Sequence, residues 1–296
     1  MPTSPSIVPT NILTVDVEEY FHATEVQRSV TPDQWRGLPS RLDAQVARTL
    51  DLLDRHRVKA TFFILGWAAE RHPKAIQEIA SRGHHLGCHS YAHQLVYDLT
   101  PAAFRDDTVR ARAAIEDACG QAVRAYRAPS YSITARSTWA LEILVECGFT
   151  HDSSIYPILH DRYGIPGFGR AAQTIHTPAG PIHEVPIAAA RILNCVCPVG
   201  GGGYLRLLPY AYTAAGIRRM NAVESLPACI YFHPWEIDPE IPRLGAGRIS
   251  RLRTYSGLAG MEAKLSRLMT EFRFDTLDAI HPWAGAGMSC TEPARC

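Results

Sequence analysis

Two histidines stand four residues apart in the segment GCHSYAH, residues 87–93. On a helical turn, side chains at this spacing share one face with Cβ atoms about 5–6 Å apart, which is close enough to bind one metal ion. We therefore expect His89 and His93 to lie on such a turn. The spacing alone does not separate a metal site from two surface histidines, because the chain contains 13 histidines.

Two carboxylates lie at the end of an apolar segment near the N-terminus. Residues 12–17 (ILTVDV) are apolar and β-branched, which predicts a short buried strand. Proteins of the α/β class collect their chemistry at the carboxyl ends of strands. Asp16 and Glu18 point to the same side of an extended chain, because side chains alternate with a period of two. One could ligate a metal ion while the other accepts a proton; the alternative is solvated acids that open a loop.

Three later segments carry single polar residues at predicted turns and strand ends. Arg127 precedes the proline of YRAPSY, Asp152 follows the segment FTH, and His233 ends the aromatic segment IYF. Each has an ordinary explanation when taken alone: a surface ion pair, a turn residue and a core histidine. Their order along the chain favours a shared site instead.

In five ordered motifs the chain resembles the NodB-type polysaccharide deacetylases, carbohydrate esterase family 4. The motifs are TVD at 14–16, HSxxH at 89–93, RxP at 127–129, DSS at 152–154 and FH at 232–233, so the resemblance spans about residues 10–280. It is closest to the subgroup associated with exosortase and exopolysaccharide gene clusters. The hallmarks of that subgroup are present as DVEEYF (16–21), RAPSYSI (127–133), GGGYLRLLP (201–209) and YFHPWE (231–236).

The resemblance implies catalytic and metal-binding roles. Asp16 is the expected base, His233 the expected general acid to the leaving amine, and His89 and His93 the expected metal ligands. The common first motif has a second aspartate directly after the base, and that aspartate binds the metal. This chain has Val17 there, so we expect Glu18, one residue later, to replace it.

Supporting and substrate-binding roles are expected for other residues near these motifs. Arg127 should hold the Asp16 carboxylate in place, and Asp152 should order Arg127 or another polar partner. The usual aromatic residue after the proline of the third motif is replaced by Ser130, with Tyr131 one position later. The candidate substrate-binding residues are Tyr20, Phe21, Ser130, Tyr131 and Trp235.

A divalent metal ion is the expected cofactor, with zinc as the leading candidate. Two imidazoles and one carboxylate leave coordination positions open for water and substrate, which is typical of a catalytic zinc site rather than a closed structural one. The same ligand set also accepts cobalt, nickel or iron.

Helical and extended patterns alternate along the chain. Helices are predicted at 43–56, 73–82, 101–119, 137–147, 209–221 and 260–271, strands at 59–65 and 83–87, and a long loop near the site at 156–173. This rhythm predicts an α/β fold with parallel strands, and the resemblance specifies a distorted (β/α) barrel of about seven strands with a C-terminal extension. We expect one domain over residues 1–280 and a flexible tail at 281–296.

Composition excludes several classes of partner. The chain has 296 residues, 46% of them hydrophobic, and a net charge of +1, so we expect no nucleic-acid binding. No apolar run reaches the roughly 18 residues that a membrane span needs. Residues 1–11 lack the pattern of a signal peptide, which predicts a cytoplasmic location. The oligomeric state is not defined by these features.

The combined expectation is a metal-dependent hydrolase. Its substrate would be an N-acetylated carbohydrate, either a polysaccharide or its lipid-linked oligosaccharide precursor, in exopolysaccharide biosynthesis. One alternative is hydrolysis of another non-peptide C–N bond in a small molecule, as in allantoinase-like or cyclic-imidase-like enzymes. The other is a catalytically silent, carbohydrate-binding relative, which the presence of Asp16, His89, His93 and His233 disfavours.

Overall fold

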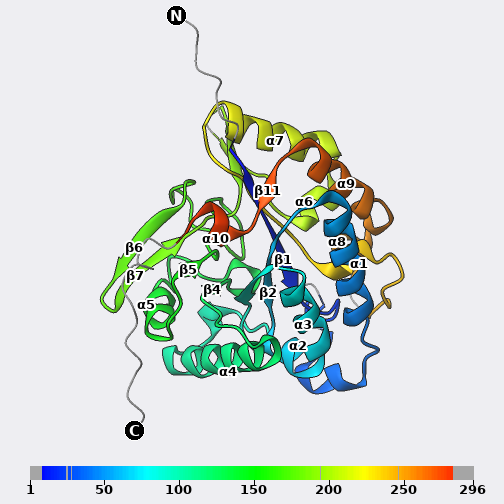
Figure 1. The fold of residues 1–296 in the computed structure, drawn as a ribbon, viewed down its shortest axis with the longest axis vertical. Coiled ribbons are helices and arrows are strands. Elements are labelled where there is room, and N and C mark those ends of the chain that lie inside the picture. The colour runs from blue at the N-terminus through cyan, green and yellow to red at the C-terminus, as the bar shows by residue number, and fades with distance from the viewer. Residues whose placement is uncertain (1–8, 25, 28, 194, 246, 283–296) are drawn as a thin grey trace, which may run out of the picture.

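A curled sheet of mostly parallel strands forms the centre of the protein, and helices wrap around it (Figure 1). This architecture comes from a computed structural model that describes residues 9–24, 26–27, 29–193, 195–245 and 247–282. The strand order is β10-β1-β2-β3-β4-β5-β7-β6, with β11 also paired to β1. All neighbours are parallel except β6 and β7. The predicted α/β fold is therefore confirmed as a curled half-barrel.

The strands are short, and those at the centre are buried. The main sheet contains β1 (Asn11–Val17), β2 (Thr61–Ile64), β3 (His85–Cys88), β4 (Ala125–Tyr126), β5 (His151–Asp152), β6 (Gln173–Thr177), β7 (Gly180–Glu184), β10 (Cys229–Phe232) and β11 (Phe274–Asp275). A separate antiparallel pair consists of β8 (Ala189–Ile192) and β9 (Cys195–Pro198). All seven residues of β1 are buried, because this strand has neighbours on both sides and covered faces.

The six predicted helices are all confirmed, with small shifts at their ends. The helices of the described residues are α1 (Leu42–His56), α2 (Gly66–Arg71), α3 (Pro73–Ser81), α4 (Pro101–Cys119), α5 (Trp139–Glu146), α6 (Gly202–Leu207), α7 (Tyr210–Ala222), α8 (Arg248–Tyr255), α9 (Leu258–Glu271) and α10 (Leu277–Ile280). The ends of helix α4 could be predicted because capping residues mark both of them. The Thr100 hydroxyl accepts a hydrogen bond from the Ala103 amide, proline follows at the first helical position, and Gly120 ends the helix with φ 69°.

The parallel strands place several polar residues along one edge of the sheet. Asp16, His89, Arg127 and His233 lie at or just after the carboxyl ends of β1, β3, β4 and β10. The predicted loop at 156–173 contains no helix or strand between β5 and β6, and its residues His160 and Tyr163 line the cavity at that edge. Sequence-distant motifs thus meet because parallel strands end at a common edge.

Two further expectations concern the whole chain. Among the described residues, no helix is long and apolar enough to cross a membrane, in agreement with the hydropathy of the sequence. Most of the expected tail, residues 283–296, lies outside the described residues. The assignment of residues 1–280 to one domain stays a prediction.

Candidate active site

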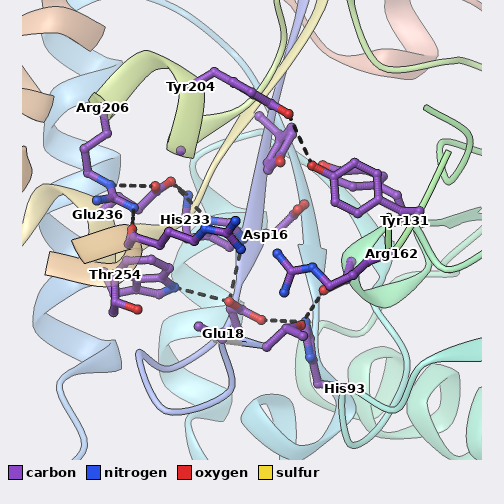
Figure 2. A pocket seen from close by; sticks show the side chains of 18 of the residues that line it. Asp16, Glu18, His93, Tyr131, Arg162, Tyr204, Arg206, His233, Glu236 and Thr254 are labelled. Carbon is purple, nitrogen blue, oxygen red and sulfur yellow. Dashed lines mark hydrogen bonds and ion pairs between the residues drawn. The ribbon is translucent and has the colours of Figure 1, made fainter. Parts of the chain in front are cut away.

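A cavity of about 440 Å³ opens at the carboxyl edge of the sheet (Figure 2). Its walls contain eight of the twelve predicted site residues, which come from four separated segments of the chain. The eight are Asp16, Glu18, His89, His93, Ser130, Tyr131, His233 and Trp235. Arg127 does not line the cavity but forms an ion pair with Asp16, which does.

The two histidines lie on a loop, not on a helical turn as their spacing suggested. His89 directly follows β3, and residues 89–95 form no helix. Ser90 and His93 adopt left-handed backbone conformations, with φ 67° and 53°. The Gln27 side-chain amide supports this loop by donating to the His93 carbonyl (3.1 Å) and by contacting His93 Nδ1 at 2.8 Å. The rings still converge, with centroids 5.4 Å apart.

Glu18 faces the histidines. Its Oε2 lies 2.9 Å from His93 Nε2, and the ligand atoms of Glu18, His89 and His93 all lie within 4.8 Å of one another. Trp235 Nε1 donates to Glu18 Oε1 at 3.2 Å, which fixes the rotation of the carboxylate. Burial alone raises the pKa of the Glu18 carboxyl, but the neighbouring His93 and His233 outweigh burial and hold that pKa well below its usual range.

The chemistry of this set fits a divalent metal ion. His89 Nδ1 contacts the Arg127 carbonyl at 2.8 Å, so that nitrogen carries the proton and Nε2 has a free lone pair. Burial is the main cause that lowers the pKa of His89 to about 4, which keeps this imidazole neutral as a ligand must be. A buried carboxylate beside a neutral imidazole and a second histidine is a typical donor set for zinc and similar ions.

Asp16 is held by a fully buried arginine. Arg127 Nη1 donates to Asp16 Oδ1 at 2.8 Å and to Thr14 Oγ1 at 2.6 Å. Ser153 fixes the rest of the guanidinium through its carbonyl, which accepts from Nε at 3.0 Å, and its hydroxyl, which accepts from Nη2 at 2.9 Å. The arrangement predicted for Arg127 and Asp16 is present, and Ser153 supplies the support expected from Asp152.

Asp152 lies behind this arrangement and does not line the cavity. Its Oδ1 accepts a hydrogen bond from Ser154 Oγ at 2.5 Å, and its carboxyl pairs with that of Glu184. Ser154 Oγ also accepts from the Ala128 amide at 2.8 Å. Asp152 was expected to order Arg127 or another polar partner, and the structure shows the second arrangement. The two-residue strand end turns Ser153 toward the guanidinium, and Asp152 supports the next peptide unit through Ser154.

His233 stands across the cavity from the histidine loop. Its Nε2 faces Glu18 Oε1 at 3.6 Å, and its Nδ1 contacts Glu236 Oε2 at 3.0 Å. Burial acts to lower the pKa of His233, but Glu18 and Glu236 outweigh it and raise the pKa to about 9. The imidazolium form is therefore favoured near neutral pH, which suits a proton donor.

Glu236 and Arg206 are two site residues that the sequence did not single out. Arg206 Nε donates to Glu236 Oε1 at 3.1 Å, so Glu236 connects the arginine to His233. Gly202 permits this contact, since a Cβ atom there would lie 1.7 Å from Glu236 Oε2. The sequence signal that could have identified Arg206 and Glu236 is their position in the segments GGGYLRLLP and YFHPWE.

The substrate-binding expectations divide into two groups. Ser130, Tyr131 and Trp235 line the cavity, together with tyrosines that the sequence did not select: Tyr97, Tyr163, Tyr204 and Tyr231. Tyr20 and Phe21 do not line it. The chain turns after Glu18 and buries both rings in an aromatic cluster with Trp35 and Trp67, so substrate contact by Tyr20 and Phe21 is not supported.

Comparison with known sequences finds two family models and curated deacetylases that each match part of this chain. Residues 37–151 match the model of the polysaccharide deacetylase family, and residues 153–281 match a domain of unknown function, DUF3473. A peptidoglycan-N-acetylglucosamine deacetylase from Bacillus cereus is 33% identical over 32% of this chain and 35% of its own length. A chitooligosaccharide deacetylase from Bradyrhizobium is also 33% identical, over 32% of this chain and 41% of its own length. The matched part thus spans well under half of these curated relatives.

Solved structures agree on the fold. A protein from Mycobacterium smegmatis, provisionally assigned as a polysaccharide deacetylase, has a TM-score of 0.59 at 19% identity, covering 93% of this chain and 89% of its own. A CE4-family pseudoenzyme from Bacillus anthracis has a TM-score of 0.51 at 15% identity, covering 93% and 66%. At these identities the likeness defines the architecture alone.

The fold and the polar cavity together define an α/β protein with the architecture of CE4 deacetylases. Residues 37–151 match the polysaccharide deacetylase model, and the matching curated relatives are deacetylases that align with about a third of this chain.

Proposed function

We propose that this protein is a metal-dependent hydrolase that removes N-acetyl groups from a polysaccharide or from its lipid-linked oligosaccharide precursor. One observation carries the proposal: a candidate base, a candidate metal-ligand set and a candidate acid surround one cavity. These are Asp16; Glu18, His89 and His93; and His233. The matching relatives are deacetylases of peptidoglycan N-acetylglucosamine and of chitooligosaccharide, which supports an N-acetylated sugar as the substrate.

In the proposed mechanism Glu18, His89 and His93 would hold a divalent metal ion. When bound there, it would supply polarisation of the acetyl carbonyl and a lower pKa, toward about 7, for a water molecule. Asp16 accepts the proton of the attacking water on its Oδ2 oxygen, since Oδ1 is engaged by Arg127. Arg127 fixes the direction in which the free oxygen points.

His233 completes the reaction from the other side. The C–N bond breaks, acetate forms, and His233 Nε2 donates a proton to the leaving amine nitrogen. The contact between Nδ1 and Glu236 orients the ring and keeps Nε2 directed at the cavity. Trp235, whose ring stacks on His233 at 5.2 Å between centroids, adds an apolar wall beside the acid.

The cavity walls suit a sugar ring. Tyr131, Tyr163, Tyr204 and Tyr231 present aromatic faces with hydroxyl groups, which can stack on a pyranose and hydrogen-bond its hydroxyls. The proposal has four further parts. The resident metal is zinc, and the protein belongs to the exosortase-associated subgroup. It acts in exopolysaccharide biosynthesis, and its location is cytoplasmic.

Two other functions compete with this one. A hydrolase of another C–N bond in a small molecule needs the same base, metal and acid. A catalytically silent carbohydrate-binding protein needs none of them, and a pseudoenzyme shares this fold.

An acetate-release assay separates the three. The metal-loaded protein would be offered N-acetylated oligosaccharides and, separately, cyclic ureides, with Asp16→Asn as the inactive control. We expect acetate from the oligosaccharides, stoichiometric with new free amine. Turnover of ureides alone would support the small-molecule alternative, and sugar binding without turnover would support the silent one.

A further inference from the structure

One side of the cavity mouth is formed by a helix with unusual surface chemistry. Helix α8 has the sequence RISRLRTY, and two of its aliphatic side chains are exposed to solvent. Ile249 is 69% exposed and Leu252 is 62% exposed. They stand three positions apart and therefore share one face of the helix. Leu207, at the end of α6, is 45% exposed as well.

The same region carries a concentrated positive charge. Residues 241–261 contain four arginines, at 243, 248, 251 and 253, and no aspartate, glutamate or lysine. The charge is local, because the whole chain has a net charge of only +1. Arg248 and Arg251 are exposed and three positions apart, so they flank the exposed aliphatic side chains. We call Leu207, Arg243, Arg248, Ile249, Arg251 and Leu252 the cationic-aliphatic face.

This face adjoins the opening of the active-site cavity. Leu207 at the end of α6, Leu208 directly after it, and Arg253 and Thr254 from α8 line the cavity. Figure 2 shows Thr254 and Arg206 on this side. Arg206 joins the two helices, since its Nη2 donates to the Arg253 carbonyl at 2.5 Å and its Nη1 donates to the Ser256 carbonyl. Lys264 on α9 donates to the carbonyls of Leu205 (2.8 Å) and Leu208 (2.8 Å), so α9 holds the C-terminal end of α6 in place.

We propose that the cationic-aliphatic face docks on the surface of an anionic phospholipid bilayer. Arginines attract the negatively charged headgroups, while aliphatic side chains beside them enter the boundary between headgroups and acyl chains. No helix of the described residues spans a membrane, so the contact is peripheral. A polyanionic polysaccharide would satisfy the arginines but would leave Ile249 and Leu252 exposed, and exposed aliphatic side chains add nothing to its recognition.

Docking in this way brings the cavity mouth to the membrane. A sugar attached to a lipid carrier would stand at the height of the headgroups, where the rim of Leu207, Leu208 and Arg253 lies. The docking inference itself does not depend on the deacetylase chemistry, because lipid binding is measured without any turnover.

The direct test is co-sedimentation of the full chain with vesicles. We expect binding to vesicles of phosphatidylglycerol and phosphatidylcholine in equal parts, weakening with added salt, and little binding to phosphatidylcholine alone. Each arginine near such a surface contributes about fivefold in the binding constant, so Arg248→Gln with Arg251→Gln should weaken binding about 25-fold. Ile249→Ser with Leu252→Ser should weaken it about tenfold.

Matched controls change the same residue types elsewhere on the surface. Leu193→Ser with Val223→Ser removes two exposed aliphatic side chains, and Arg36→Gln with Arg124→Gln removes two exposed arginines; both pairs should bind like the unmodified chain. Circular dichroism confirms that each variant is folded. Failure to bind the anionic vesicles, or equal losses in the controls, would overturn the proposal. Equally tight binding to soluble alginate that is lost with the arginine pair but kept with the aliphatic pair would assign the face to a polyanion instead.

Discussion

Two pairs of buried carboxyl groups at the same edge of the sheet have different surroundings. Asp16 lies on β1 and Glu18 directly after that strand, and both reach the cavity, where Arg127 binds the first and His93 the second. Asp152 and Glu184 are in register on β5 and β7, face each other, and line no part of the cavity. The same residue types at the same edge therefore have different chemistry.

The partners cause this difference. Glu18 lies among histidines that favour its charged form, whereas Glu184 is buried beside another carboxyl, and both burial and Asp152 raise the pKa of Glu184 well above its usual value. Burial also raises the pKa of Asp152. Glu18 is thus held as a carboxylate, and the second pair holds a proton between its members.

The largest effect should follow from neutralising Asp16. Asp16→Asn preserves the size of the side chain and removes the proposed proton acceptor, so kcat should fall by about 10⁴ while bound metal is retained. Acetate release measured beside metal analysis checks both parts.

Glu18→Ala is the matched variant within this pair. It should lose metal affinity and recover part of its rate with excess metal. If Asp16→Asn loses its metal while Glu18→Ala keeps it, the two carboxylates have exchanged roles.

His233→Ala should have the next largest effect. Removing the proposed proton donor should lower kcat by about 10³ and leave the metal content unchanged. A substrate with a leaving group that needs no proton, such as an acetate ester of an acidic phenol, should be affected much less. Loss of metal from this variant would instead identify His233 as a ligand.

Glu236→Gln tests how the acid is positioned. The amide can still contact His233 Nδ1 but carries no charge, so kcat should fall by about tenfold to a hundredfold with little change in KM. Glu236→Asp should recover part of the lost kcat, because aspartate restores the negative charge on a side chain that is one methylene shorter. A variant that folds and turns over normally would show that Arg206 and Glu236 serve only to join α6 to the segment after β10.

The six predicted helices and eight of the residues that line the cavity could be predicted from the sequence because their signals are local. The apolar segment before Asp16, the capped helix α4 and the ordered motifs each depend on neighbouring residues. Details that depend on distant contacts were missed. The histidine loop takes a left-handed path supported by Gln27, 66 positions away from His93, and the Arg206–Glu236 pair joins residues 30 positions apart.

The burial of Tyr20 and Phe21 has a similar cause. Aromatic residues beside a catalytic motif can pack inward or face a substrate, and the motif alone does not distinguish the two. Trp35 and Trp67, which come from segments after the motif, pack around Phe21, and the Tyr20 ring packs against Phe21. Tertiary packing thus overrides the local pattern.

The smallest effect on activity, but a clear effect on stability, is expected for Glu184→Gln. The folded-state pKa of Glu184 lies well above 4.5, its ordinary value, so the folded chain keeps a proton that the unfolded chain releases. The free energy of unfolding should therefore fall as pH rises from about 5 toward neutrality, by about 1.4 kcal/mol per pH unit from this group. Glutamine has no proton to release, so Glu184→Gln should remove that part of the slope and leave acetate release nearly unchanged.

Urea unfolding across this pH range measures how the free energy of unfolding depends on pH. The control is Asp117→Asn, an exposed position where the substitution should keep the wild-type slope. An unchanged slope in Glu184→Gln would mean that Asp152 holds the proton, and the contrast between the two carboxyl pairs would then rest on Asp152.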